Sequence, residues 1–129
     1  MRNSVVVVFS LLFAGFAAPV VAHEGHMSGG KAAMKTVTGE VVDMGCYLGH
    51  AARGEKHVSC ATKCLNNGMP MGLLTSNGTL YLLTLNHDNA DPYNSLKNMA
   101  GKNVTVTGEV MARSGIQGID VSAVRPAAK

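Results

Sequence analysis

The chain has 129 residues, 47% of them hydrophobic, which is enough for one small packed domain. Its formal net charge is only +3 at pH 7, and the basic residues form no run of the kind that binds nucleic acid. Trp is absent and all three Phe lie within the first 16 residues, so the rest of the chain lacks most of the aromatic side chains on which nucleic-acid bases stack. We therefore expect no nucleic-acid partner.

The first 22 residues have the pattern of a signal peptide. Arg2 supplies a positive start, residues 5–16 are apolar, and Val20 and Ala22 fit the −3 and −1 positions of a cleavage site. The apolar stretch is shorter than the ~20 residues that a membrane span needs. We expect export to the periplasm or out of the cell, with no stable membrane span after cleavage; an uncleaved anchor is the alternative.

The whole chain divides by composition. Residues 1–22 form the predicted signal peptide and residues 23–35 a flexible tail that contains His and Met without hydrophobic periodicity. The folded domain is predicted over residues 36–125, followed by a disordered C-terminus at residues 126–129.

The folded domain begins with the alternation of a strand and continues with a glycine-containing loop from residue 46 to residue 56. Ser59 is the predicted N-cap of a first helix and Asp91 that of a second. Asn77-Gly78 is typical of a tight hairpin turn. The predicted elements, in order, are a strand at 36–44, a helix at 59–66, strands at 71–75 and 79–85, a helix at 91–100, and strands at 104–112 and 116–124.

The order strand, helix, strand, strand, helix, strand, strand matches the OB-fold plan, so we predict a mainly β chain that forms a five-stranded OB-like barrel with two short helices. Another small barrel or an open α+β sheet is the alternative. The sequence of residues 36–41 recurs at residues 105–110, and we interpret the copies as two strands with equivalent demands. Each copy contains a Gly that would allow a bulge or a sharp bend.

Five potential metal ligands lie close together in the sequence: Cys46, His50, His57, Cys60 and Cys64. They include every Cys of the chain, and three cysteines in an exported protein cannot all pair with one another. On a helix Cys60 and Cys64 would share a face with Cβ atoms ~5–6 Å apart, wider than the ~3.5–4.5 Å of a disulfide. This spacing favours a shared metal ion over a mutual disulfide.

A set of Cys46, His57, Cys60 and Cys64 would offer three sulfurs and one nitrogen, with His50 as a substitute ligand. Zinc accepts such a tetrahedral set, and Cu(I) favours thiolates. We therefore predict a copper or zinc site between the first and second strands. It would serve in metal handling, with a periplasmic protein as partner, or it would be a structural site.

Two alternatives stay open. A disulfide from Cys46 to Cys60 or Cys64 would leave one free thiol and staple a non-enzymatic domain that binds protein or glycan. Alternatively, Cys60 or Cys64 would be the attacking thiol of an oxidoreductase, a chemistry that needs an acidic thiol. Surface or capping roles suffice for Asp43, and no nucleophile elbow, P-loop or dinucleotide motif is present, so we name no catalytic residue and favour a non-enzyme.

One further pattern spans the predicted ligands: Gly39-x-Val41-x-Asp43-x-x-Cys46, then His57-x-x-Cys60-Ala61-x-x-Cys64, then Gly68-x-Pro70-x-Gly72. This pattern resembles that of small exported bacterial proteins of uncharacterised function with predicted OB-like barrels. The resemblance covers most of residues 36–124 and implies an exported location and this fold, but no activity.

Separately, Cys60-x-x-x-Cys64 is similar to the copper-binding pair of Sco-type copper chaperones. That family has a thioredoxin-like fold and its pair is usually followed by Pro, whereas Leu65 follows here and the predicted strand order is not thioredoxin-like. Only the local ligand chemistry is implied.

Overall fold

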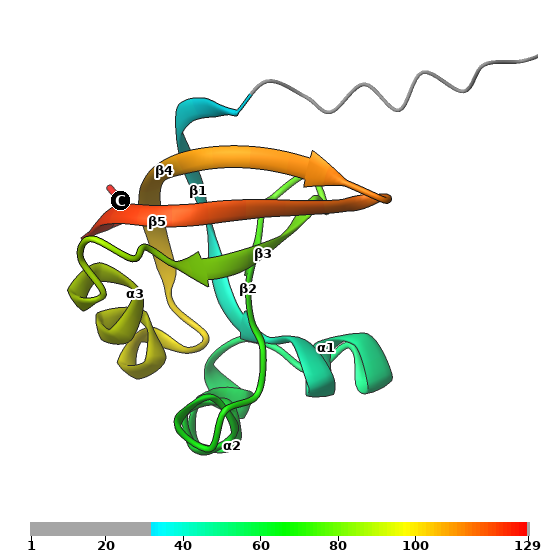
Figure 1. Ribbon diagram of the computed structural model, residues 1–129. Helices are drawn as coiled ribbons and strands as arrows, with labels where there is room; N and C mark the ends of the chain where they lie inside the picture. Colours follow the sequence, from blue (N-terminus) through cyan, green and yellow to red (C-terminus); the bar gives the residue numbers. More distant parts are fainter. Residues whose placement is uncertain (1–31, 129) are drawn as a thin grey trace, which may run out of the picture.

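A closed five-stranded barrel forms the centre of the computed structural model, which describes residues 32–128 (Figure 1). The strands are β1 (Ala33–Asp43), β2 (Met71–Leu74), β3 (Leu80–Leu85), β4 (Asn103–Arg113) and β5 (Ile116–Pro126). They follow one another around the barrel as β1-β2-β3-β5-β4, and β4 pairs with β1 to close it. Among these five strand pairs of residues 32–128, β3 and β5 run parallel and the other four pairs are antiparallel. This is the predicted mainly β, OB-like barrel.

The first strand begins earlier than the predicted start of the folded domain. The predicted signal peptide lies outside the described residues, as does most of the predicted tail. Strand β1 begins at Ala33, three residues before the predicted start, because its first residues already pair with β4: Ala33 lies opposite Val110 and Lys35 opposite Gly108. None of the helices within residues 32–128 is long and apolar enough to cross a membrane.

Short helices lie in two connections of the barrel, between β1 and β2 and between β3 and β4. They are α1 (Met44–His50), α2 (Val58–Asn66) and α3 (Asp91–Leu96), with single 3₁₀ turns η1 (Glu55–His57) and η2 (Lys97–Met99). The prediction of a loop from residue 46 was wrong for its first part, where α1 lies. Asp43 stabilises the start of α1, since its side chain accepts a hydrogen bond from the Cys46 N–H, and Ala51 ends it in the left-handed conformation.

Both predicted N-caps were also wrong by one or two positions. The cap of α2 is His57, which makes no side-chain capping hydrogen bond, and Ser59 lies inside the first turn. The cap of α3 is Ala90, so Asp91 is the first helical residue. There its carboxylate is close to the positive end of the helix dipole, which is a favourable place for an acidic residue without a capping bond. Helix α3 ends at Leu96 and continues as η2.

The two copies of the repeated sequence are direct neighbours in the barrel. Residues 36–41 of β1 run antiparallel to residues 105–110 of β4, so that threonines of the two copies lie opposite one another. The hydroxyl groups of Thr36 and Thr107 are 3.0 Å apart, and those of Thr38 and Thr105 are 2.9 Å apart. The two copies therefore pair with each other, and the hydrogen bonds between their threonines stabilise the contact of β1 with β4.

The predicted bulge is present in the second copy. The register between β4 and β5 shifts between Thr107 and Gly108, and a Cβ atom on Gly108 would overlap the backbone carbonyl oxygen of Asp120. In the first copy, a Cβ atom on Gly39 would lie 2.6 Å from the carbonyl oxygen of Leu74, where β1 changes partner from β4 to β2. Both glycines thus permit the close backbone contacts that closing a small barrel requires.

Aliphatic side chains from the strands and helices fill the barrel. In α2, Ala61 and Leu65 are 3% and 1% exposed and pack into this core, so one face of the helix is apolar and buried. Burial of that face fixes α2 across the end of β1 and leaves its remaining surface for polar side chains. The core residues are Val41, Ala61, Leu65, Met71, Leu73, Leu83, Leu96, Ala100, Val104, Val106, Ile119 and Val121.

Candidate metal centre

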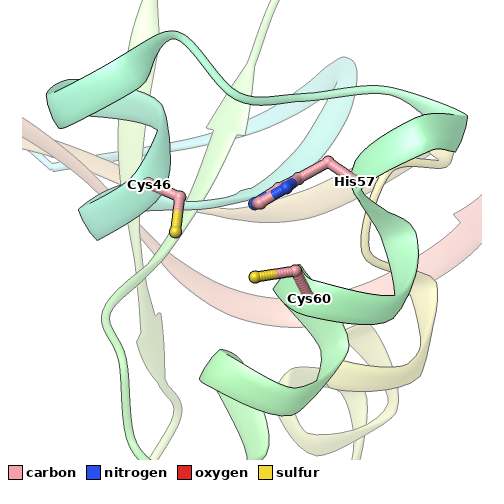
Figure 2. A group of neighbouring side chains, drawn as sticks. All are labelled: Cys46, His57 and Cys60. Carbon is pink, nitrogen blue, oxygen red and sulfur yellow. The ribbon is translucent and has the colours of Figure 1, made fainter.

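Three of the predicted ligands converge where β1 passes into the helices. Cys46 lies in α1, His57 ends η1, and Cys60 lies in the first turn of α2. Their ligand atoms all lie within 4.8 Å of one another, and Figure 2 shows the three side chains pointing toward a common centre. Separate elements of the chain thus bring two sulfurs and one imidazole to one place, where they could hold a metal ion.

A second group of three overlaps the first. Asp43, Cys46 and Cys64 also have ligand atoms within 4.8 Å of one another. Cys46 belongs to both groups, so the predicted set of Cys46, His57, Cys60 and Cys64 lies in one neighbourhood, but Cys64 is grouped with Cys46 and Asp43 and not with His57 and Cys60. We call the five residues of the two groups the ligand cluster. All three cysteines are free thiols.

The remaining predicted ligand, His50, does not join this cluster. It is the last residue of α1, its side chain is exposed, and it belongs to neither group. Its spacing of four residues from Cys46 places the two on similar sides of a helix. However, α1 directs its first turn toward α2, while its last turn extends away from it (Figure 2).

Asp43 is the member of the cluster that sequence reasoning missed. A capping role is confirmed, because Oδ1 accepts the Cys46 N–H at 3.1 Å, but the residue is only 1% exposed and is not a surface residue. Its other oxygen, Oδ2, lies 3.5 Å from Nε2 of His57, and within residues 32–128 neither atom has a hydrogen-bond partner. The available signal was an Asp three residues before a Cys at the end of a strand, the position of a helix N-cap.

The carboxylate changes the protonation of the neighbouring thiols. Side-chain hydrogen bonding to Asp43, together with burial, raises the pKa of Cys46 to about 12. Burial and hydrogen bonding to Cys60 also raise the pKa of Cys64. For Asp43 itself, burial raises the pKa, but the neighbouring thiol and backbone N–H of Cys46, together with the imidazole of His57, outweigh that effect and hold the pKa below its usual value. A metal ion that binds Cys46 and Cys64 must therefore displace their protons.

Backbone contacts hold His57 and the start of α2 in place. The N–H of Gly54 donates to Oε1 of Glu40 on β1, and the carbonyl of Gly54 accepts the N–H of His57. Gly101, which follows η2, packs against the segment that carries His57. A Cβ atom on Gly101 would lie 2.7 Å from Cγ2 of Val58 and 3.0 Å from the carbonyl oxygen of Gly54. The position of the imidazole is thus set by β1 on one side and by the segment after η2 on the other.

The chemistry of the cluster narrows the class of ion. Calcium and magnesium prefer sites built from several oxygen ligands, whereas the cluster offers three sulfurs, one imidazole and a single carboxylate. Thiolate and imidazole ligands suit zinc and copper. The residues present therefore fit the predicted metals and do not fit the alkaline-earth ions.

Comparisons of this chain with protein-family models, with curated proteins and with solved structures found no match. What the cluster does must follow from its own residues and distances.

Proposed function

We propose that this protein is an exported metal-binding module that holds a copper or zinc ion at Cys46, His57 and Cys60, with Cys64 as the fourth ligand and the carboxylate of Asp43 beside the site. The observation that carries the proposal is the convergence of three ligand atoms, from three elements, within 4.8 Å. Sulfur and nitrogen ligands on one tetrahedral ion lie roughly 3.3–3.8 Å apart. Binding would therefore need inward movements of about 1 Å or less, which side-chain rotation can supply.

Both roles predicted for the metal find support in the cluster. Helices α1 and α2 are 7 and 9 residues long, and helices this short are marginal unless tertiary contacts stabilise them. An ion that joins Cys46 to Cys60 would tie them together. Cys60 is exposed, so a ligand exchange with a partner protein would begin there. Delivery to a periplasmic partner and structural stabilisation are thus roles of one site.

The metal content of anaerobically purified mature protein tests the proposal. We expect about one copper or zinc ion per chain, retained after dialysis and lost in Cys60→Ser and Cys64→Ser. His57→Ala should weaken binding, whereas His50→Ala is the matched control and should not, because His50 lies outside the cluster. Substoichiometric metal that stays unchanged in the two serine variants would contradict the proposal.

A second candidate is a protein- or glycan-binding barrel stapled by a disulfide. The same proximity favours it, because the sulfurs of Cys46 and Cys60 already lie within 4.8 Å of each other. They would have to approach to the ~2.05 Å of a disulfide bond. Mass spectrometry under non-reducing conditions separates the candidates. Protein from the oxidising compartment with one disulfide and one free thiol supports the staple, whereas three free or metal-protected thiols support the metal site.

A thiol oxidoreductase was predicted to attack through Cys60 or Cys64, and the surroundings of Cys64 do not favour that role. An attacking thiol needs a lowered pKa, because only the thiolate is a nucleophile. The pKa of Cys46 is raised to about 12 by the neighbouring carboxylate, and that of Cys64 is raised by burial. Both directions oppose a free thiolate, while a bound metal ion would overcome them.

A further inference from the structure

We infer that the buried carboxylate of Asp43 shifts the preference of the centre toward zinc relative to Cu(I). The inference rests on the proposed function and deepens it, since it names the class of ion that the same cluster holds. It concerns a residue to which the sequence assigned only a surface or capping role. Its premises are the burial of this side chain, the unsatisfied oxygen that it presents, and the net charge of the groups around it.

The unsatisfied oxygen points to a missing cationic partner. The Asp43 side chain is fully buried, yet Oδ2 has no hydrogen-bond partner among the described residues. Leaving a buried charged oxygen unpaired is costly, and buried carboxylates are normally paired or bound to metal. His57 Nε2, at 3.5 Å, is beyond the usual ~2.7–3.2 Å of a hydrogen bond. Two oxygen or nitrogen ligands on one tetrahedral zinc ion lie roughly 3.3 Å apart. The 3.5 Å between Oδ2 and Nε2 is therefore close to the separation of two atoms that share an ion.

Two arrangements place this carboxylate beside the ion. In the first, Asp43 is itself a ligand, as its grouping with Cys46 and Cys64 allows. In the second, a small movement lets Oδ2 accept the Nε2 proton of His57, and the other ring nitrogen binds the metal. Carboxylates that orient metal-bound histidines in this way are common in zinc sites. Either arrangement adds one negative charge within reach of the ion.

Charge and ligand type then favour zinc. Three thiolates and one carboxylate make four negative groups, of which Zn²⁺ compensates two and Cu(I) one, so that Cu(I) leaves more uncompensated charge in a partly buried site. Zinc accepts oxygen, nitrogen and sulfur ligands, whereas Cu(I) selects soft thiolates and gains little from a carboxylate. Removing the carboxylate should therefore weaken zinc binding more than Cu(I) binding.

The test compares Asp43→Asn with the wild-type mature protein. Asn caps a helix about as well as Asp, so the variant keeps the capping oxygen of α1 but replaces Oδ2, and with it the negative charge, by an amide NH2 group. Asp120→Asn is the matched control, because Asp120 on β5 also has a buried oxygen without a partner but belongs to neither ligand group. Asp43→Ser supplies a second uncharged capping residue.

Affinities for Zn²⁺ and, without oxygen, for Cu(I) are measured by competition with chromophoric chelators. We expect the ratio of zinc affinity to Cu(I) affinity to fall about 10- to 100-fold in Asp43→Asn and Asp43→Ser, the usual effect of removing a supporting carboxylate. Asp120→Asn should leave the ratio unchanged. The metal-free state cancels in this ratio, so the readout stays valid even if a metal-free variant is unfolded.

Each outcome decides a different point. A ratio that is unchanged in the Asp43 variants, or equal losses for both ions, would overturn the inference while the metal centre stands. A wild-type protein that binds Cu(I) but not Zn²⁺ would do the same. A wild-type protein that binds neither ion would overturn the proposed function, and the inference with it.

Discussion

Replacing Gly101 by alanine should destabilise the protein and disturb the ligand cluster at the same time. Gly101 has φ +72°, in the left-handed region, and the new Cβ atom would lie 2.7 Å from Cγ2 of Val58 and 3.0 Å from the carbonyl oxygen of Gly54. Val58 is β-branched and begins α2, so its methyl group cannot rotate away freely. The backbone between Gly54 and Val58, which carries His57, would have to move.

The loss of unfolding free energy in Gly101→Ala has two parts, and a control variant separates them. The left-handed conformation costs alanine about 1–2 kcal/mol relative to glycine. The overlap adds about 1–3 kcal/mol, as is typical of overpacking. Gly115 also has a left-handed φ of +81°, but no atom lies within 4 Å of a Cβ atom built there. Gly115→Ala should therefore show the first part alone.

Urea denaturation of the metal-free Gly101→Ala and Gly115→Ala proteins measures their loss of unfolding free energy, and zinc titration measures their affinity for the ion. We expect Gly101→Ala to lose about 1–3 kcal/mol more unfolding free energy than Gly115→Ala. In a domain of this size each kcal/mol lowers Tm by about 4–8 °C. Only Gly101→Ala should also weaken zinc binding. Equal destabilisation in the two variants, with zinc affinity intact in both, would refute the argument that this close contact positions His57.

Three further outcomes are expected. Zinc affinity should rise about tenfold per pH unit for each proton displaced from Cys46 and Cys64, measured by chelator competition between pH 6 and 8, and a flat profile would show that these thiols are not ligands. The neighbouring Asp43 raises the pKa of Cys46 in the folded protein to about 12, above its ordinary value of 9.0. The protonated thiol therefore contributes fully to the stability of the metal-free protein below pH 9.0, and this contribution is lost as the pH rises toward 12. Urea denaturation at alkaline pH should show the loss of stability, and Cys46→Ser should make that loss smaller. Gly108→Ala should cost at least about 1–3 kcal/mol because its Cβ atom meets the β5 backbone, whereas Gly49→Ala, with open space around it, should be neutral or stabilising; similar thermal melts for the two would contradict the proposed role of the bulge.

The barrel was predictable because its signals are local. Alternating apolar residues, the Asn77-Gly78 turn and the order of the elements restrict a chain of this length to few topologies. The pairing of the two repeated segments was not predicted, although the shared TVTGEV sequence had indicated equivalent strands. Which strands become neighbours depends on closure of the whole sheet, and no local pattern carries that information.

Helix α1 shows where local reasoning failed. Two glycines, Gly45 and Gly49, lower the helix propensity of the segment, which therefore has the composition of a loop. The segment is helical because Asp43 caps its start, and because the N–H of Met44 donates to the Pro70 carbonyl at 2.9 Å, which holds the end of β1 beside β2. The second of these contacts is long-range and cannot be read from the segment itself.

Sequence alone determined which chemical groups this protein has available: an odd number of cysteines, a Cys60–Cys64 pair spaced for one helix face, and nearby histidines. Only the tertiary structure decided which of them meet. Closing the barrel places the end of β1 against the start of α2, so a buried Asp43 faces His57, whereas His50 at the far end of α1 remains in solvent. Spacing along a chain limits which ligands can share a helix face, but the packing of separate elements sets the distances between them.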